Sequence, residues 1–83
     1  MAESSIGQRA QEARKRAGMT QEEAVRGLRA RMGEDAPSLS WLSKLERGVY
    51  SDPSARAIAE LARLYRCDPG VLAAGEDTEQ GAA

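Results

Sequence analysis

The segment Ser38–Gly48, which reads SLSWLSKLERG, carries the side chains best suited to bind another molecule. On a helix with about 100° per residue, Leu42 and Leu45 share one side and define a buried edge. The opposite side gathers small polar and basic residues, namely Ser40, Ser43, Lys44 and Arg47. Because that side has slim hydroxyls, two cations and no acid, it suits a helix that enters the major groove of DNA. The alternative interpretation is an ordinary amphipathic helix.

Side chains for catalysis and metal binding are scarce. The 83 residues include no histidine and one cysteine, and there is no glycine-rich phosphate loop. The chain therefore lacks the commonest general base and metal ligand. We expect no catalytic residue, no metal, no cofactor and no small-molecule ligand, and an enzyme is disfavoured. Cys67 cannot form a disulfide within the chain, which fits a reducing compartment.

Charge is unevenly distributed along the chain. Between residues 6 and 75 there are 12 basic and 9 acidic residues, whereas the tail EDTEQGAA holds three acids. The part expected to be ordered is mildly positive and favours an anionic partner. No stretch approaches the roughly 20 apolar residues that span a bilayer, and MAESSIGQ lacks the features of a secretory signal. We expect a cytoplasmic protein associated with the nucleoid and not with a membrane.

The pattern predicts one small all-α domain, a compact bundle of four to five helices, because strand-like alternation is missing. Residues 6–75 should form this domain, with a disordered N-terminus (1–5) and a disordered acidic tail (76–83). The first two helices should each begin with a capping box, a hydroxyl residue followed three positions later by Glu or Gln. The two boxes are Ser5–Gln8 and Thr20–Glu23.

The remaining helix boundaries follow from turn residues. The segment SLSWLSKLERG should begin at its first serine and end at its glycine, in a left-handed conformation. Ser51 or Asp52 should cap a fourth helix, with Pro53 at its first position, where the missing N–H costs nothing. A short fifth helix is expected over residues 69–74.

Three stretches together resemble a known family. They are IGQRAQEARKRAGMTQEEA, SLSWLSKLERG and DPSARAIAELARLYRCDPGVL, and they are similar to the phage-repressor-like helix-turn-helix family of the Cro/C1 or XRE type. The resemblance covers residues 6 to about 72, and RKRAGMTQEE, LERG and PGVL are its most specific points. It implies a lambda-repressor-like bundle that binds double-stranded DNA. Helix two would cross the DNA backbone, and helix three would lie in the major groove.

The resemblance also implies residue roles. Base contacts are implied for helix three at Leu39, Ser40, Ser43 and Lys44. Lys44 suits guanine O6 or N7, whereas Leu39 suits a thymine methyl or, equally well, packing. Phosphate contacts are implied for Arg47 and for Gln21, which lies where the N–H groups of helix two would meet an anion.

Three further residues are interpreted as structural. Arg14 and Glu46 match a paired Arg–Glu of the family that ties helix one to helix three. Trp41 lies on the flank of helix three and is expected to pack on Met32 or Leu28. A contact with the DNA backbone is the alternative for Trp41.

Two departures from the family pattern concern helix two. The segment Thr20–Ser38 is several residues longer than usual, with RARMGED as the excess, as in some actinobacterial members. Either helix two is extended or the turn bulges. Ala24 and Val25 reverse the usual order of a large apolar residue and alanine, which bears on packing against helix three. Arg29 and Arg31 either stand beside the DNA backbone or are solvated.

Two functions from different classes follow. The first is a sequence-specific DNA-binding transcriptional regulator, a homodimer on a near-palindromic site. Its dimer contacts would come from Val71 and Leu72, with Tyr65 as a further candidate. The second is an antitoxin-like or adaptor module that uses the same fold, through an apolar groove, to bind a protein partner. A variant of the first function is a protein that compacts DNA broadly, without sequence specificity.

Overall fold

The computed structural model describes residues 5–50 and 53–74, which contain five α-helices and one 3₁₀ turn. The elements are α1 (Ile6–Arg16), α2 (Gln21–Met32), η1 (Gly33–Asp35), α3 (Leu39–Glu46), α4 (Ala55–Tyr65) and α5 (Pro69–Ala74). These ranges contain no strand, so the predicted all-α bundle is confirmed. The ends predicted to be disordered lie outside the described residues, except Ser5, which caps α1.

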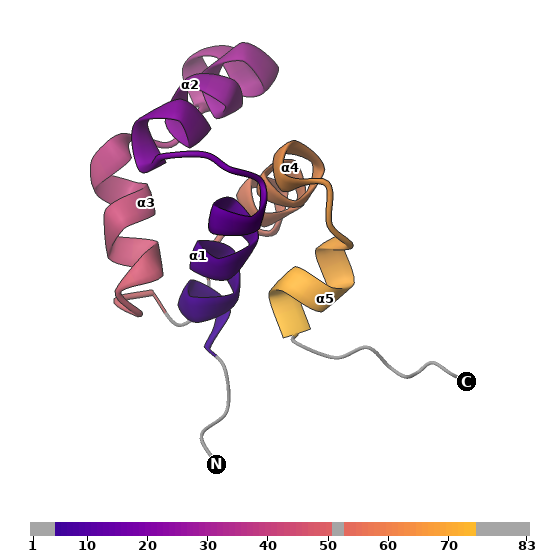
Figure 1. Cartoon of the computed structure of the whole chain (residues 1–83). Coiled ribbons are helices and arrows are strands. Elements are labelled where there is room, and N and C mark those ends of the chain that lie inside the picture. The colour runs from indigo at the N-terminus through magenta and orange to yellow at the C-terminus, as the bar shows by residue number, and fades with distance from the viewer. Residues whose placement is uncertain (1–4, 51–52, 75–83) are drawn as a thin grey trace.

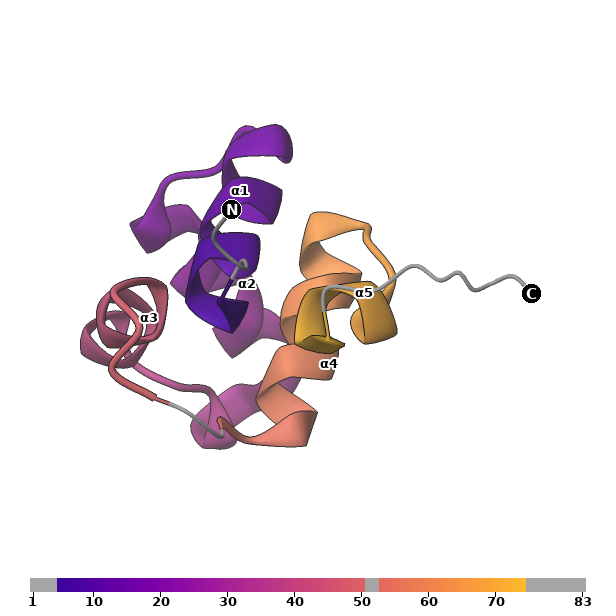
Figure 2. The same cartoon turned by 90° about the horizontal axis from the view of Figure 1, so that it is seen from below.

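Helix α1 lies in the middle of the bundle. It packs against α3 on one side and against α4 and α5 on the other, and α2 packs on both α3 and α4 (Figure 1). Seen from below, α3 and α5 again lie at opposite edges (Figure 2). One side of α3 is therefore left uncovered by the other helices.

Local capping chemistry explains where the first three helices begin and end. Both predicted capping boxes are confirmed. In each, the hydroxyl oxygen accepts a hydrogen bond from the backbone N–H three residues later, and the side-chain oxygen of that later residue accepts one from the backbone N–H of the hydroxyl residue. Ser38 caps α3, its Oγ accepting from the Trp41 N–H at 3.2 Å. Gly48 follows α3 with φ of 83°, as predicted, because glycine has no Cβ to clash there.

The predicted start of α4 is wrong. Ser54 is the N-cap, its Oγ accepting from the Ala57 N–H at 3.3 Å, and Pro53 precedes the cap. Ser51 and Asp52 lie outside the described residues. Three residues of the stretch SDPS have side chains that can cap a helix. The prediction chose a residue before the proline because proline prefers the first helical position, but the cap is the serine after it.

The long connection between α2 and α3 has a defined path. Helix α2 continues to Met32, and η1 and three residues outside any helix then lead to α3. The segment RARMGED is thus the end of a long helix followed by a 3₁₀ turn. Asp35 in this turn forms an exposed ion pair with Arg56 of α4 at 3.2 Å.

The core is built from leucines and small residues. The largest fully buried side chains are Leu28, Leu42, Leu45, Leu61 and Leu72. The prediction of a dimer surface at Leu72 and Tyr65 is wrong, because these side chains are only 2% and 5% exposed and belong to the core of the monomer. Of the predicted set only Val71 reaches the surface, at 39% exposure.

Gly7 sets the separation of α1 and α3. A Cβ at Gly7 would lie 2.1 Å from the Leu45 carbonyl oxygen, a backbone atom that cannot rotate away. We predict that Gly7→Ala lowers the free energy of unfolding by about 1–3 kcal/mol or more, measured by urea denaturation followed by circular dichroism.

Gly27→Ala is the matched control for this test. Its Cβ would meet only side-chain atoms of Leu64, the nearest being Cδ1 at 2.6 Å and Cδ2 at 3.1 Å, and this half-buried side chain can rotate away. Alanine also favours the helix by about 1 kcal/mol at both positions. Gly27→Ala should therefore stay within about 1 kcal/mol of wild type. Equal losses for the two variants would show that close α1–α3 contact is not what requires Gly7.

Candidate nucleic-acid interface

The inner side of α3 is held by a buried ion pair. Arg14 of α1 donates from Nε to Glu46 Oε2 at 2.7 Å and from Nη2 to Oε1 at 2.9 Å. Both side chains are largely buried. Two parallel N–H···O bonds fix the relative orientation of the two groups as well as their distance. The structure thus joins Arg14 and Glu46, two of the three residues predicted to be structural.

The same pair is linked to the start of α2. Gln21 donates from Nε2 to Glu46 Oε1 at 2.9 Å, and Arg14 Nη1 donates to the Met19 carbonyl at 2.9 Å. The hydrogen bond to Glu46 raises the pKa of Arg14 above its ordinary value, so the guanidinium stays charged. One carboxylate thereby connects α1, α2 and α3, a link to Gln21 that the sequence did not predict.

Tyr65 packs beneath this network. Its side chain is buried, and its hydroxyl has no hydrogen-bond partner within the described residues. Burial first, and then the negative charge of Glu46, raise the pKa of Tyr65 well above its ordinary value of 10. The hydroxyl is therefore neutral at physiological pH.

The outer side of α3 is open. Ser40, Lys44 and Arg47 are exposed, and Ser43 is half-buried. Neither cation forms an ion pair within the described residues, although Arg47 Nε donates to the Ser43 carbonyl at 3.4 Å. Leu39 is 39% exposed at the N-terminal end of the helix. The predicted base-contacting side chains thus share one accessible face that carries no acid.

Trp41 is half-buried on the flank of α3. Its ring stacks on Tyr50, with centroids 6.1 Å apart and planes inclined by 26°. Tyr50 belongs to the segment after α3, so the stack holds that segment against the helix. Trp41 and Met32 both pack against the core, but Tyr50 is a partner that the sequence did not predict. Tyr50 lies in a loop nine positions after Trp41, so no helical spacing connects the two residues in the sequence.

Arg29 and Arg31 of α2, for which the sequence left a DNA-backbone contact and a solvated position open, differ in their surroundings. Arg31 Nε donates to Glu60 Oε1 of α4 at 2.7 Å, which turns it toward α4 and neutralises its charge. This pairing lowers the pKa of Glu60. Arg29 is exposed and forms no ion pair within the described residues.

The described part of the chain has neither a metal-binding cluster nor a membrane-spanning helix. There, no three His, Cys, Asp or Glu side chains lie close enough to hold a metal ion. None of the described helices is long and apolar enough to cross a membrane. Cys67 is half-buried, and burial raises the pKa of its thiol.

We predict that Glu46→Ala lowers the free energy of unfolding by about 3–5 kcal/mol, because it leaves the Arg14 guanidinium buried without its carboxylate. Urea denaturation measures the loss. The double variant Arg14→Met/Glu46→Leu should lose less than either Arg14→Met or Glu46→Leu alone, because apolar packing replaces both charges. A loss below about 1 kcal/mol for Glu46→Ala would show that the pair does not hold the helices together.

Comparison with known proteins identifies the family. A family model described as a helix-turn-helix domain matches residues 5–75, which includes every described helix. No curated protein matched the chain significantly. The solved structures likewise gave no significant match. The matched region contains the uncovered face of α3 and the start of α2, where Gln21 is hydrogen-bonded to Glu46 of α3. The chain belongs to the helix-turn-helix domain family, a family of DNA-binding domains.

Proposed function

We propose that this protein is a sequence-specific transcriptional regulator of the Cro/C1 or XRE type that inserts α3 into the major groove of DNA. Residues 6–75 would be its DNA-binding domain. The observation that carries the proposal is the accessible, acid-free face of α3, held outward by the buried pair on its inner side. A major groove about 12 Å wide admits such a helix. A protein with this role would work in the cytoplasm, at the nucleoid.

The side chains of this face divide into base and phosphate contacts. Lys44 would donate to guanine O6 or N7. The hydroxyls of Ser40 and Ser43 would form hydrogen bonds with either donors or acceptors on the base edges. Leu39 would meet a thymine methyl. Arg47, at the C-terminal end of α3, would hold a phosphate.

Gln21 would make the second phosphate contact, in addition to that of Arg47. One N–H of its side-chain amide is used by Glu46, and an amide nitrogen carries two. The second N–H, with the free backbone N–H groups that begin α2, would meet the phosphate. Glu46 would then orient a DNA-contacting residue as well as pairing with Arg14.

The connection between α2 and α3 would distinguish this protein from shorter relatives. Six residues separate the two helices, whereas a typical helix-turn-helix uses three or four. We take this as the lengthened segment of the subfamily that the sequence resembles. The ion pair between Asp35 of η1 and Arg56 of α4 is exposed and would contribute little to holding this connection, so the extra residues would act through the tilt of α2.

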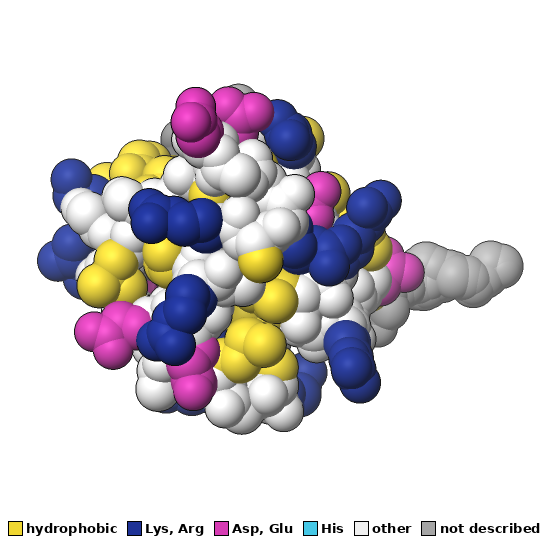
Figure 3. Space-filling model, turned by 90° about the horizontal axis from the view of Figure 1, so that it is seen from above, with side chains coloured by type: hydrophobic (Ala, Val, Ile, Leu, Met, Phe, Trp, Pro, Cys, Tyr) yellow, Lys and Arg dark blue, Asp and Glu magenta, His cyan; other side chains and the backbone are white. Residues whose placement is uncertain are grey.

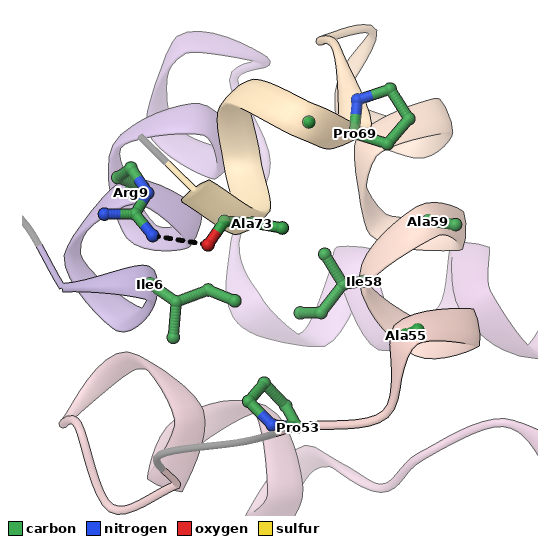
Figure 4. Close-up of a pocket in the computed structure, with 9 residues that line it drawn as sticks. Ile6, Arg9, Pro53, Ala55, Ile58, Ala59, Pro69 and Ala73 are labelled. Carbon is green, nitrogen blue, oxygen red and sulfur yellow. Dashed lines mark hydrogen bonds between the residues drawn. The ribbon is translucent and has the colours of Figure 1, made fainter. Parts of the chain in front are cut away.

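A homodimer would use a surface other than the buried Leu72. An apolar groove of about 560 Å³ lies between α1, α4 and α5, with Ile6, Ile58 and Pro69 among its walls (Figure 4). Arg9 closes one end by donating to the Ala73 carbonyl at 2.7 Å. A second copy of the chain would cover this groove and set two α3 helices about 34 Å apart, one turn of DNA.

The groove also favours the alternative function. An antitoxin-like or adaptor subunit would use the same apolar walls to bind a different protein, and its α3 face would be solvated. The two candidates differ in what α3 does, so selection of DNA separates them.

We predict that wild-type protein selects a motif from a random duplex pool. Lys44→Ala should relax one base position with a cost of about 1–3 kcal/mol, because the donor to that base is lost. Arg47→Ala should weaken all sequences alike and reduce the slope of log affinity against log salt by about one. Sequencing of the selected pool, with titrations at two salt concentrations, measures both effects.

An exposed cation on α1 serves as the control for this selection. Lys15, the other lysine of the chain, is exposed and lies outside α2 and α3. Lys15→Ala should retain the wild-type motif. Tight binding without any motif would indicate DNA compaction. Absence of binding by folded wild-type protein would favour the protein-interaction module.

We predict that Ala55→Glu weakens self-association about tenfold or more, because it places a charge at the rim of the apolar groove. The acid lies in the first turn of α4, where the helix dipole favours it, so folding should be preserved. Sedimentation equilibrium measures the dimer dissociation constant. Ala30→Glu, on an exposed position of α2, is the control. A wild-type monomer at 100 µM, or equal dissociation constants for both variants, would refute this dimer surface.

A further inference from the structure

A second surface feature lies away from the outer face of α3. A hollow of about 750 Å³ opens where the C-terminal ends of α1 and α4 approach the end of α2. Four guanidinium groups line it, from Arg16, Arg31, Arg63 and Arg66. On the face seen from above, Lys and Arg side chains stand beside exposed hydrophobic atoms (Figure 3). Spacing along the chain did not predict this cluster, because its members come from three separate helix ends.

The positive charge in this hollow is largely uncompensated. No carboxylate belongs to its lining, and Glu60 pairs with Arg31. Arg16, Arg63 and Arg66 form no ion pair within the described residues. The dipoles of α1 and α4 favour a cation at each C-terminal end, which accounts for each arginine taken singly. They do not account for three like charges gathered around one hollow, since like charges repel.

Arg66 provides a second, independent observation. It ends α4 in the left-handed conformation, with φ of 61° and ψ of 45°. The other described residues with positive φ are the glycines that follow α1, α2 and α3, namely Gly18, Gly33 and Gly48. Glycine would occupy this position without steric strain. Non-glycine residues in such strained conformations cluster at functional sites, so the backbone of Arg66 points to a function for its side chain.

The floor of the hollow is apolar. Ala17, Met19 and Leu64 contribute to it, and the buried ring of Tyr65 lies beneath. Its volume lies within the range of about 300–1,000 Å³ that is usual for small-molecule sites. Guanidinium groups bind phosphate oxygens in a bidentate manner, and several of them match a ligand with more than one phosphate.

We infer that this hollow binds a small polyphosphate with a flat apolar body, the chemical class of the nucleoside triphosphates. The phosphates lie among Arg16, Arg63 and Arg66, and the base covers Met19 and Leu64. Such a ligand joins the ends of three helices and lies away from the outer face of α3. The site does not depend on the proposed DNA-binding function.

Calorimetric titration of the full chain with ATP, in low salt and without DNA, tests the inference. Wild-type protein should bind ATP with a dissociation constant below about 1 mM, and inorganic tripolyphosphate more weakly because it lacks the base. Arg66→Gly should weaken ATP binding about tenfold or more, since it removes charged hydrogen bonds. It also relaxes the left-handed backbone, so its melting temperature should not fall and unfolding cannot explain the loss. Arg63→Gln should weaken binding similarly.

Arg26→Ala is the control, because Arg26 is exposed on α2 and lies outside the hollow. It should bind ATP like wild type. Absence of ATP binding by wild type, or full retention of it by both hollow variants, would overturn the inference. So would tripolyphosphate bound as tightly as ATP, or a glutamate-rich peptide bound in place of both. Failure of the DNA-binding proposal would leave these titrations unchanged, so the two results are distinguishable.

Discussion

The buried Arg14–Glu46 pair is the interaction on which the arrangement of the first three helices depends. Glu46 accepts two hydrogen bonds from α1 and one from Gln21 of α2, so one carboxylate fixes the relative positions of three elements. A buried ion pair of this kind adds little net stability compared with apolar packing. Its contribution is orientation, because the bidentate geometry admits one placement of α3 against α1. Gly7 permits the close contact that the pair requires.

That orientation decides which side of α3 faces outward. With Glu46, Leu42 and Leu45 turned inward, the serines and cations of the helix point away from the bundle. The Trp41–Tyr50 stack then holds the segment that follows α3. The backbone of α3 is therefore held in place before any partner binds, which lowers the entropic cost of binding. The proposed dimer groove and the arginine-lined hollow lie on other faces, so their occupants need not compete with DNA.

Much of this arrangement was predictable, because it is encoded locally. Ser5, Thr20 and Ser38 identify helix starts through side chains that reach only three residues along the chain. The amphipathic pattern of α3 gave both its buried edge and its outer face. These features depend on spacing within a single helix, and spacing is what a sequence displays.

What the sequence did not reveal depends on approach between distant elements. Gln21 meets Glu46 only after α1, α2 and α3 have packed, and Tyr50 meets Trp41 only when the chain turns back after α3. The sequence predicted Leu72 in a dimer surface because the pattern of a short amphipathic helix does not indicate what covers its apolar side. Arg66 occupies the left-handed position after α4 that glycine usually occupies. The sequence therefore has no glycine there to mark the end of α4.

The most direct test of the central claim is a nuclear magnetic resonance titration of ¹⁵N-labelled protein with a duplex taken from the selected pool. If the ion pair holds α3 as the reading helix, the largest shifts should fall on the amides of Ser40, Ser43, Lys44 and Arg47 and on the side-chain amide of Gln21. The α5 amides should change little. Binding that leaves α3 unshifted, with the largest changes on α4 or α5, would contradict the account.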